Sequence, residues 1–428
     1  MPAARIESLA REGQGVAHVE GKVVFIEGAL PGEAVEYASY RRKPAFEQAR
    51  TVRVLRPSAA RVEPRCPHFG VCGGCSLQHA DMAMQVAAKQ RVLEDALRHI
   101  GRVRPETILP AVHGPAWGYR HRARLSARYV PKKGGALVGF RERHSTYVAD
   151  MRSCAVLAPP AGALIAPLRA LVNSLAIAER LPQIELAVGS RATVLVFRNL
   201  VPLAGEDEAK LAAFAEAHGV QVWLQPKGPD SARPLHPAAP AALDYALPEF
   251  GVRIGFLPTD FTQVNHTVNE VMVRRALALL DPHPGERIGD LFCGLGNFTL
   301  PIAASGAAVA GYEGNEGLVR RARANAAANG IAATFATANL FEARACARLP
   351  VFEKLLVDPP REGAVEVVKA LPDAGAPRRI VYVSCDPATL ARDAGILANL
   401  KGYRLAAAGI VNMFPHTSHV ESMALFER

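Results

Sequence analysis

The chain has no long, uninterrupted hydrophobic run. Residues Met1–Glu7 contain no apolar segment that resembles the core of a signal peptide. Arg, Asp or Pro interrupts the longest apolar stretches, so none of them approaches the length of a membrane span. We therefore expect a cytoplasmic protein that has no membrane partner.

The composition also lacks any bias toward disorder. Hydrophobic residues make up 50% of the chain and charged residues 21%, which is typical of globular proteins. A length of 428 residues is too great for one ordinary core, so we expect two or three domains. The formal net charge of +10 suits a partner with a phosphate backbone, although charge alone does not establish nucleic-acid binding.

Disulfide bonds are not expected in a reducing compartment, so the cysteines need another explanation. Cys66, Cys72 and Cys75 are separated by five and then two residues, with glycines between them. Three thiolates need a fourth ligand, and Cys154 is the best candidate because the other cysteines lie far along the chain. The set predicts a [4Fe–4S] cluster or a zinc ion. Zinc usually has two close cysteine pairs, so one pair with an isolated fourth ligand favours iron–sulfur. A metal-free set of structural thiols is the alternative.

The N-terminal region, residues 1–58, contains short apolar runs separated by glycine-rich turns. Several strands at this spacing are typical of a small β-barrel. Arg41, Arg42 and Lys43 form a basic tip between two of these predicted strands. The tip suits a loop that contacts RNA, and it equally suits a solvated hairpin.

The middle of the chain predicts a mixture of helices and strands. Apolar residues share one helical face between 81 and 100, and Gly101 suits the end of that helix. Arginines alternate along 120–124, which predicts a strand with a cationic or simply solvated face. Residues 226–242 are rich in Pro and Ala, which predicts a loop.

From Phe256 onward, predicted strands and helices alternate as in a doubly wound α/β domain. One strand runs into a glycine-rich loop at 290–299, and the acidic residue Glu313 ends the next strand. A dinucleotide site would have a third glycine at position 299 to pass a pyrophosphate, whereas Thr299 stands there. The loop and its acid therefore favour S-adenosylmethionine over NAD, with an ordinary tight turn as the alternative.

Three further side chains stand at predicted strand ends. Asp358 follows one strand in an Asp-Pro-Pro turn, at the rim where such domains bind ligands. Cys385 follows the apolar run 379–383, and Glu421 opens another short apolar run. Taken alone, Cys385 would be a buried strand cysteine and Glu421 a surface carboxylate.

A thiol beside a methyl donor suits methylation of uracil at C5, because this carbon is a poor nucleophile. A thiolate that adds to C6 creates an enolate, which makes C5 reactive toward the methyl group. A base must then remove the C5 proton so that the thiol can be eliminated. In this hypothesis Cys385 supplies the thiolate and Glu421 the base.

These motifs resemble those of the bacterial RNA uracil-C5 methyltransferases that carry an iron–sulfur cluster, nearly from end to end. Within that family the chain is most similar to the members that act on 23S rRNA. The resemblance implies Cys385 as nucleophile and Glu421 as base. The implied cofactor positions are Gln263, Phe292, Asn297, Glu313, Asn339 and Asp358, and the implied cluster ligands are Cys66, Cys72, Cys75 and Cys154. Asp386 is a departure, since Asn is more usual beside the nucleophile.

The resemblance also implies a multidomain fold. Residues 1–58 would form a TRAM domain, an OB-like RNA-binding barrel. Residues 59–255 would form a central α+β iron–sulfur and RNA-binding domain, whose helix 81–100 would pack on the catalytic domain. Residues 256–428 would form a Rossmann-like α/β methyltransferase domain. We expect a monomer that binds 23S rRNA and takes up an unpaired or flipped uracil.

Two other functions stay open at this point. A tRNA uracil-C5 methyltransferase is the alternative within the class, and the TRAM-like barrel and the four cysteines argue against it. A catalytically silent RNA-binding assembly factor is the alternative outside the class. The intact Cys385, Glu421 and glycine-rich loop argue against that second alternative.

Overall fold

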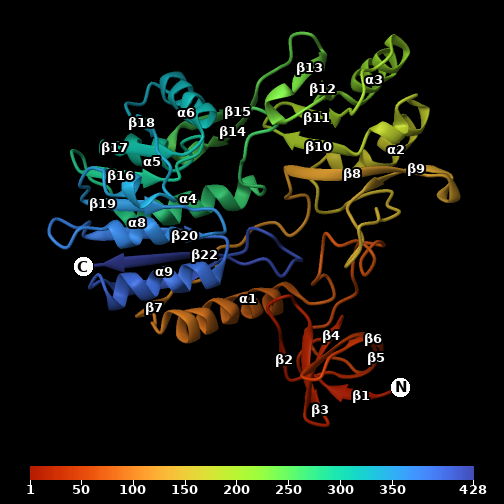
Figure 1. The fold of residues 1–428 in the computed structure, drawn as a ribbon, viewed down its shortest axis with the longest axis horizontal. Helices are drawn as coiled ribbons and strands as arrows, with labels where there is room; N and C mark the ends of the chain where they lie inside the picture. The colour runs from red at the N-terminus through yellow and green to blue at the C-terminus, as the bar shows by residue number, and fades with distance from the viewer.

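The computed structural model describes residues 1–428, which form three units in space (Figure 1). A small β unit contains the N-terminus, and a second sheet with two helices forms the centre of the sequence. A large α/β unit contains the C-terminus. None of the helices combines the length and the hydrophobicity that a membrane crossing needs.

A six-stranded sheet forms the N-terminal unit. Its strands are β1 (Ala3–Arg5), β2 (Ser8–Leu9), β3 (Gly15–Val19), β4 (Lys22–Glu27), β5 (Ala34–Arg42) and β6 (Phe46–Arg56). They follow the order β1-β5-β6-β4-β3-β2, and β1 also contacts β3, so the sheet curls around Ile6, Ile26 and Val35. The basic tip at 41–43 is exposed where β5 turns into β6.

Six strands and two helices form the central unit. They are β8 (Arg122–Val130), β9 (Gly135–Gly139), β10 (Gln183–Val188), β11 (Thr193–Arg198), β12 (Gln221–Leu224), β13 (Arg233–His236), α2 (Ile165–Ser174) and α3 (Gly205–His218). The sheet has the order β13-β12-β11-β10-β8-β9. Its buried core includes Cys72 and Cys154, so the cysteine-rich segment packs against this unit.

The central sheet confirms one expected strand and corrects one expected loop. Strand β8 alternates buried and outward residues as predicted, but Arg124 on its outer face contacts Glu185 at 3.1 Å, which partly neutralises that face. The loop predicted at 226–242 is wrong in part, because β13 lies within it. Strand β13 is an edge strand, and such a strand tolerates Pro234 although proline lacks an N–H for the ladder.

An eight-stranded sheet is the frame of the C-terminal unit. Its strands are β7 (Thr107–Ile108), β16 (Arg287–Leu291), β17 (Ala308–Glu313), β18 (Thr334–Thr337), β19 (Lys354–Val357), β20 (Arg379–Ser384), β21 (Arg404–Val411) and β22 (Glu421–Glu427). The order is β18-β17-β16-β19-β20-β22-β21-β7, with β22 antiparallel to both neighbours. The strands from β18 to β20 are parallel, as in the predicted doubly wound fold, so their carboxyl ends share one edge.

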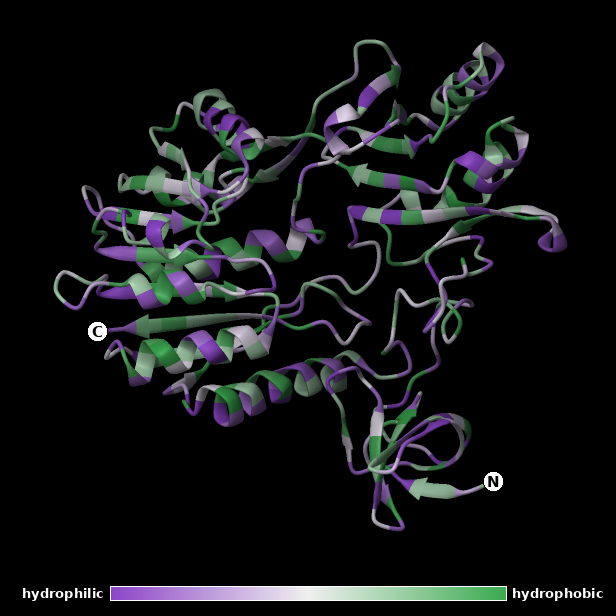
Figure 2. Cartoon of the chain, viewed as in Figure 1, coloured by the Kyte–Doolittle hydropathy of each residue, from purple (hydrophilic) through white to green (hydrophobic).

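Helices cover both faces of this sheet. One face carries α4 (His266–Leu280), α5 (Thr299–Ala304) and α6 (Glu316–Ala328), and the other carries α1 (Met82–Ala96), α7 (Ala343–Cys346), α8 (Val365–Ala370) and α9 (Pro387–Asn399). Strand side chains alternate between the two cores, with Leu356 in the first and Leu355 and Val357 in the second. The buried strands are accordingly rich in hydrophobic residues (Figure 2).

Helix α1 precedes the central unit in the sequence, yet it lies beside α9 and β21 of the C-terminal unit (Figure 1). It ends in a π-helical turn, Leu97–Gly101. The helix ends at Gly101, as expected, although Arg102 rather than the glycine takes the left-handed conformation, with φ of 54°. Gly101 also permits close packing, because a Cβ there would lie 2.5 Å from the carbonyl oxygen of Ala391 on α9.

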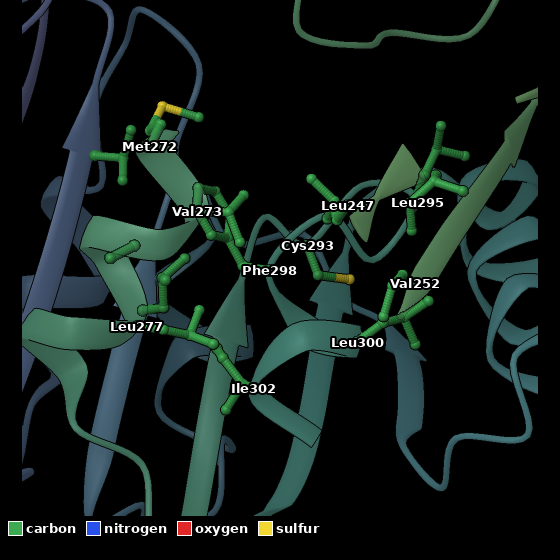
Figure 3. Close-up of a cluster of buried hydrophobic side chains, with 14 of the residues drawn as sticks. Leu247, Val252, Met272, Val273, Leu277, Cys293, Leu295, Phe298, Leu300 and Ile302 are labelled. Carbon is green, nitrogen blue, oxygen red and sulfur yellow. The ribbon is translucent and has the colours of Figure 1, made fainter. Parts of the chain in front are cut away.

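A hairpin of β14 (Leu243–Leu247) and β15 (Val252–Phe256) leads into the C-terminal unit. Figure 3 shows Leu247 and Val252 beside Cys293 and Leu295, and all four belong to one buried cluster. The boundary expected between residues 255 and 256 therefore falls inside β15. The strands of this hairpin carry the same apolar pattern as the strands of the central unit. The sequence alone therefore did not show that the hairpin packs on the C-terminal unit.

Candidate active site

The loop after β16 has the backbone conformation that its glycines predicted. Gly294 and Gly296 have positive φ values of 54° and 90°, which glycine adopts without strain. Phe292 also has a positive φ, 64°, and its ring lies 5.6 Å from that of Phe341. The amide of Gly294 donates to Oε2 of Glu313 at 3.2 Å, so the acid at the end of β17 fixes the loop.

A cavity of about 500 Å³ opens beside this loop, at the carboxyl ends of the parallel strands. Its wall contains every side chain that was predicted to bind the cofactor or to perform the reaction: Gln263, Phe292, Asn297, Glu313, Asn339, Asp358, Cys385 and Glu421. Seven different connections contribute to it, from the one between β15 and α4 to the one between β21 and β22. We refer to this space as the cofactor cavity.

Asn297 lies on the wall of the cofactor cavity, but most of its amide is used within the protein. Its Oδ1 accepts from the Tyr245 hydroxyl and from Asn269 Nδ2, each at 2.9 Å, and its Nδ2 donates to Asn269 Oδ1 at 3.0 Å. This reciprocal pair joins the glycine-rich loop to α4 and to the hairpin. Sequence reasoning missed Tyr245 and Asn269, since nothing local marks either residue as a partner of the loop.

Aromatic rings stand on one side of the cofactor cavity. Phe292 and Phe341 both line it, and the side chain of Phe341 is 46% exposed although it is large and apolar. Asn339 fixes the chain before Phe341 by accepting its amide at 3.2 Å and by donating to Glu342 at 2.7 Å. An exposed ring beside a cavity can stack on a flat heterocycle.

Three acidic groups meet at the far end of the cofactor cavity. Burial raises the pKa of Glu421 to about 8, and the negative charge of Asp358 adds to that shift. Burial likewise raises the pKa of Asp358 to about 7. Burial, then Glu421 and Asp358, raise the pKa of the Cys385 thiol to about 12, while the Arg361 cation opposes both the Cys385 and the Glu421 shifts.

A second, polar cleft of about 430 Å³ lies on the other side of Cys385. The N-terminal unit, the cysteine-rich segment and the C-terminal unit all contribute to it, through Arg11, Ser76 and Arg361 among others. Cys385 and Arg361 belong to the walls of both spaces. The thiol therefore stands where the polar cleft meets the cofactor cavity.

Asp386 connects the N-terminal unit to the residue beside the thiol. Its Oδ2 lies 2.5 Å from Nη2 of Arg11, and its Oδ1 accepts the amide of Ala388 at the start of α9 at 2.8 Å. The departure from Asn at this position therefore leaves the helix cap in place and adds an ion pair.

The four cysteines predicted to hold a cluster line one cavity of about 260 Å³. Burial raises the pKa of Cys72 to about 11 and that of Cys75 to about 12, so thiolates there require a neighbouring cation. No three His, Cys, Asp or Glu side chains are placed to hold one metal ion. The sulfurs surround a space instead, and the amide of Gly74 points at Cys72 Sγ at 3.3 Å. This arrangement fits a cluster, whose thiolates bind separate iron atoms.

Comparison with known proteins places the chain among methyltransferases that act on RNA. A family model described as tRNA (Uracil-5-)-methyltransferase matches residues 253–428, and a TRAM domain model matches residues 3–36. The 23S rRNA (uracil(1939)-C(5))-methyltransferase RlmD of Aromatoleum aromaticum is 63% identical over 100% of both chains. Proteins of the same name from Azoarcus sp. and Dechloromonas aromatica are 62% and 60% identical, again over 100% of both chains.

This chain belongs to the RNA uracil-C5 methyltransferase family. A solved structure with a similar fold is the tRNA (uracil-54, C5)-methyltransferase of Pyrococcus abyssi in complex with S-adenosyl-L-homocysteine. Its TM-score is 0.75 at 24% identity, and the match covers 99% of this chain and 100% of that one. The likeness shows a shared fold.

Membership of the RNA uracil-C5 methyltransferase family confirms three predictions from the sequence. The N-terminal unit contains a TRAM domain, the C-terminal unit is a Rossmann-like methyltransferase domain, and S-adenosylmethionine rather than NAD is the cofactor. One residue of the site was overlooked although a signal was available. Arg361 directly follows the Asp-Pro-Pro turn, so the same strand-end argument that selected Asp358 also applies to it.

Proposed function

We propose that this protein methylates C5 of a uracil in 23S rRNA, with Cys385 as the nucleophile and Glu421 as the base. The observation that carries the proposal is the place of Cys385 on the walls of both the polar cleft and the cofactor cavity. A thiol in that place reaches a base entering from the cleft and a methyl donor in the cavity. The full-length relatives with 23S rRNA in their names support the choice of RNA.

S-adenosylmethionine would be held in the cofactor cavity and supplies an electrophilic methyl group when bound. Glu313 stands at a strand end, where an acid in this fold binds ribose hydroxyls. Its carboxylate accepts the Gly294 amide and still has free lone pairs that can accept from those hydroxyls. The rings of Phe292 and Phe341 offer flat surfaces to the adenine. Gln263, Asn297, Asn339 and Asp358 complete the proposed set.

The reaction assigns one role to each of the buried reactive groups. Addition of the Cys385 thiolate to uracil C6 forms the S–C6 bond and moves electrons to O4 as an enolate. C5 would then take the methyl group as the S–CH3 bond of the sulfonium donor breaks and a neutral thioether leaves, and C5 still carries its proton. Glu421 removes that proton, and the S–C6 bond breaks as the C5–C6 double bond re-forms. The positive charge of Arg361 favours the thiolate and carboxylate forms that these steps require.

Cys66, Cys72, Cys75 and Cys154 would bind a [4Fe–4S] cluster in the cysteine-lined cavity. Such a cluster supplies no electron to the methylation, which is redox-neutral. Its proposed role is structural, because the segment after Cys75 contacts the chain that precedes Glu421. The amides of Ser76 and Leu77 both donate to the carbonyl oxygen of His416 at 2.9 Å.

Basic side chains outside the two cavities would hold the RNA backbone. They lie on the exposed tip 41–43 and on the outer end of β8 and the turn after it, at Arg128, Lys132 and Lys133. Contacts of this kind make the affinity for RNA fall steeply as the salt concentration rises.

A tRNA enzyme is the second candidate, because the matching family model and the P. abyssi protein carry tRNA in their names. A catalytically silent assembly factor is not supported, because Cys385, Glu421 and the proposed cofactor-binding residues all line one cavity.

Mass mapping of methylated uracils in rRNA and tRNA from cells that lack the protein tests the proposed target. We expect one 5-methyluridine to disappear from 23S rRNA. Loss from tRNA instead would contradict the target, and no loss in either RNA would contradict the activity.

Cys385→Ala tests the nucleophile. Methyl transfer should vanish while RNA binding, measured by gel shift, is retained, because the thiol is needed only for the covalent step. Cys346→Ala is a matched control, since Cys346 is a buried cysteine of the same unit outside both cavities. Measurable turnover by Cys385→Ala would exclude the mechanism.

A further inference from the structure

Lys89, on α1, is a buried lysine without an acidic partner. Its side chain is 2% exposed, and its Nζ donates to Asn412 Oδ1 at 2.7 Å and to the Phe414 carbonyl oxygen at 2.8 Å. Both acceptors are neutral, and no ion pair within 4.0 Å involves this ammonium. Burial lowers the pKa of Lys89 to about 7, while the negative charge of Glu421 opposes that shift. An unpaired buried charge is costly, so the carboxylate whose negative charge acts on Lys89 is significant.

Both acceptors belong to residues 412–420, which we name the base loop because it ends at the proposed base. Strand β21 ends at Val411, the register partner of Glu421 on β22, and Asn412 follows directly. Phe414 lines the cofactor cavity together with Glu421. The ammonium of Lys89 therefore supports both the start and the middle of the base loop from the side of α1.

Charged and titratable groups surround Glu421 from several elements. Asp358 and Cys385 come from the ends of β19 and β20, and Arg361 comes from the turn after Asp358. His419 Nε2 lies 3.9 Å from Glu421 Oε1, and burial lowers the pKa of this histidine to about 4, so it is neutral at pH 7. Lys89 and Arg361 are the cations that favour the Glu421 carboxylate.

The two cations differ in what else they reach. Arg361 lines both spaces and acts on Cys385 as well as on Glu421. Lys89 lines neither space, and its hydrogen bonds go to the base loop rather than to the turn that carries Cys385. Removal of Lys89 should therefore affect proton removal without affecting addition of the thiol.

We propose that Lys89 is a positioning residue for the methylation reaction. Its ammonium holds the base loop in place and supplies the positive charge that keeps Glu421 ready to accept the C5 proton. The inference rests on the proposed role of Glu421, and it identifies a residue of α1, far from Glu421 in sequence, as part of that role.

Lys89→Met tests the proposal, because methionine keeps much of the apolar stem and removes the charge. RNA with 5-fluorouracil at the target reports thiol addition and methyl transfer alone, since no base can remove fluorine from C5. We expect the fluorinated adduct to form at the wild-type rate. Turnover on uracil RNA should fall by about tenfold, the effect of one unit in the pKa of the base. An adduct that resists denaturation should accumulate, and the pH profile of its resolution should move to higher pH.

Three companion variants make the result decisive. Lys354→Met is the matched control, because Lys354 is also buried, 1% exposed, but lies at the opposite end of β19 and pairs with Glu286 at 2.8 Å. It should leave the pH profile unchanged. Lys89→Arg should restore part of the wild-type profile. Asn412→Asp replaces the amide that accepts from Lys89 with a carboxylate of the same shape, which neutralises the ammonium. This variant should therefore reproduce the pH profile expected of Lys89→Met, even if Lys89→Met fails to fold.

Two outcomes would overturn the role of Lys89. Equal losses on uracil and fluorouracil RNA would mean that Lys89 only supports the fold. An unchanged pH profile in both Lys89→Met and Asn412→Asp would mean that its charge does not act on the base. Glu421→Gln separates this inference from the proposed function, because failure of Glu421→Gln to trap an adduct refutes the role of Glu421 itself.

Discussion

Burial determines the behaviour of Glu421 as a single residue. The residue is 7% exposed at the start of β22, and a pKa of about 8 places its proton exchange close to neutral pH. The folded state binds this proton more tightly than the unfolded chain, whose carboxyl has a pKa of 4.5. The resulting stability is fully present below pH 4.5 and is lost as the pH rises through about 8.

Glu421→Gln should have opposite effects on activity and stability. Turnover should fall by about 10² to 10⁴, the usual worth of a general base, and a covalent protein–RNA adduct should accumulate on denaturing gels. The Tm should exceed that of the wild type at pH 8 and match it near pH 4, because glutamine avoids burial of a charge. Glu94→Gln, on the exposed face of α1, is the control and should change neither quantity. A lower Tm for Glu421→Gln at pH 8 would contradict this account.

At the scale of the element, α9 depends on Asp386, the residue that follows the proposed nucleophile. Asp386 caps the helix through the Ala388 amide, and Pro387 occupies the first helical position, where its missing N–H costs nothing. The same carboxylate contacts Arg11 of the N-terminal unit. One side chain thereby fixes the turn that presents Cys385 and ties that turn to the TRAM domain.

Substitutions of Asp386 separate the cap from the ion pair. Asp386→Asn keeps an acceptor for the cap, so it should leave the Tm nearly unchanged, because a partly exposed ion pair contributes only about 0–1 kcal/mol. Asp386→Ala removes the cap and should cost about 1 kcal/mol of stability. Single-turnover methylation should fall in Asp386→Ala far more than in Asp386→Asn. Equal losses in both variants would show that the Arg11 contact, rather than the cap, presents the thiol.

At the scale of the whole molecule, the catalytic sheet is not built from one continuous stretch of sequence. Strand β7 and helix α1 precede the central unit, yet they complete the edge and one face of the sheet. The hairpin β14–β15 completes the core on the other face.

A fragment of residues 256–428 should therefore fail to fold alone. Without α1 it exposes the apolar surfaces of α9 and β21, so thermal scans by circular dichroism should show no cooperative transition. Residues 59–428 retain those contacts and should unfold cooperatively. Cooperative unfolding of the shorter fragment would contradict this expectation.

Features that depend on neighbouring residues could be predicted from the sequence, whereas distant contacts could not. The glycine-rich loop and Cys385 each follow an apolar run and Glu421 opens one, so local pattern marked all three as candidates. That pattern alone favoured structural roles for Cys385 and Glu421, and the resemblance to a known family selected them as nucleophile and base. Lys89 and Tyr245 have no such mark, because their partners lie 323 and 52 positions away in the chain. The packing role of Gly101 was missed for a related reason. A side chain at this position would collide with α9, which is distant in the sequence, so the helix that contains Gly101 gives no sign of the constraint.

The separation between Lys89 and Asn412 also has a consequence for synthesis of the protein. A ribosome adds roughly 5–20 residues per second, so these 323 positions take on the order of tens of seconds to make. Throughout that time α1 has been translated while β21 and the base loop do not yet exist. The nascent chain thus carries an amphipathic helix without its partner, a typical target for chaperones that hold unfolded chains. The proposed base, Glu421, is added after all of these residues, so a nascent chain that stops before it lacks part of the proposed site.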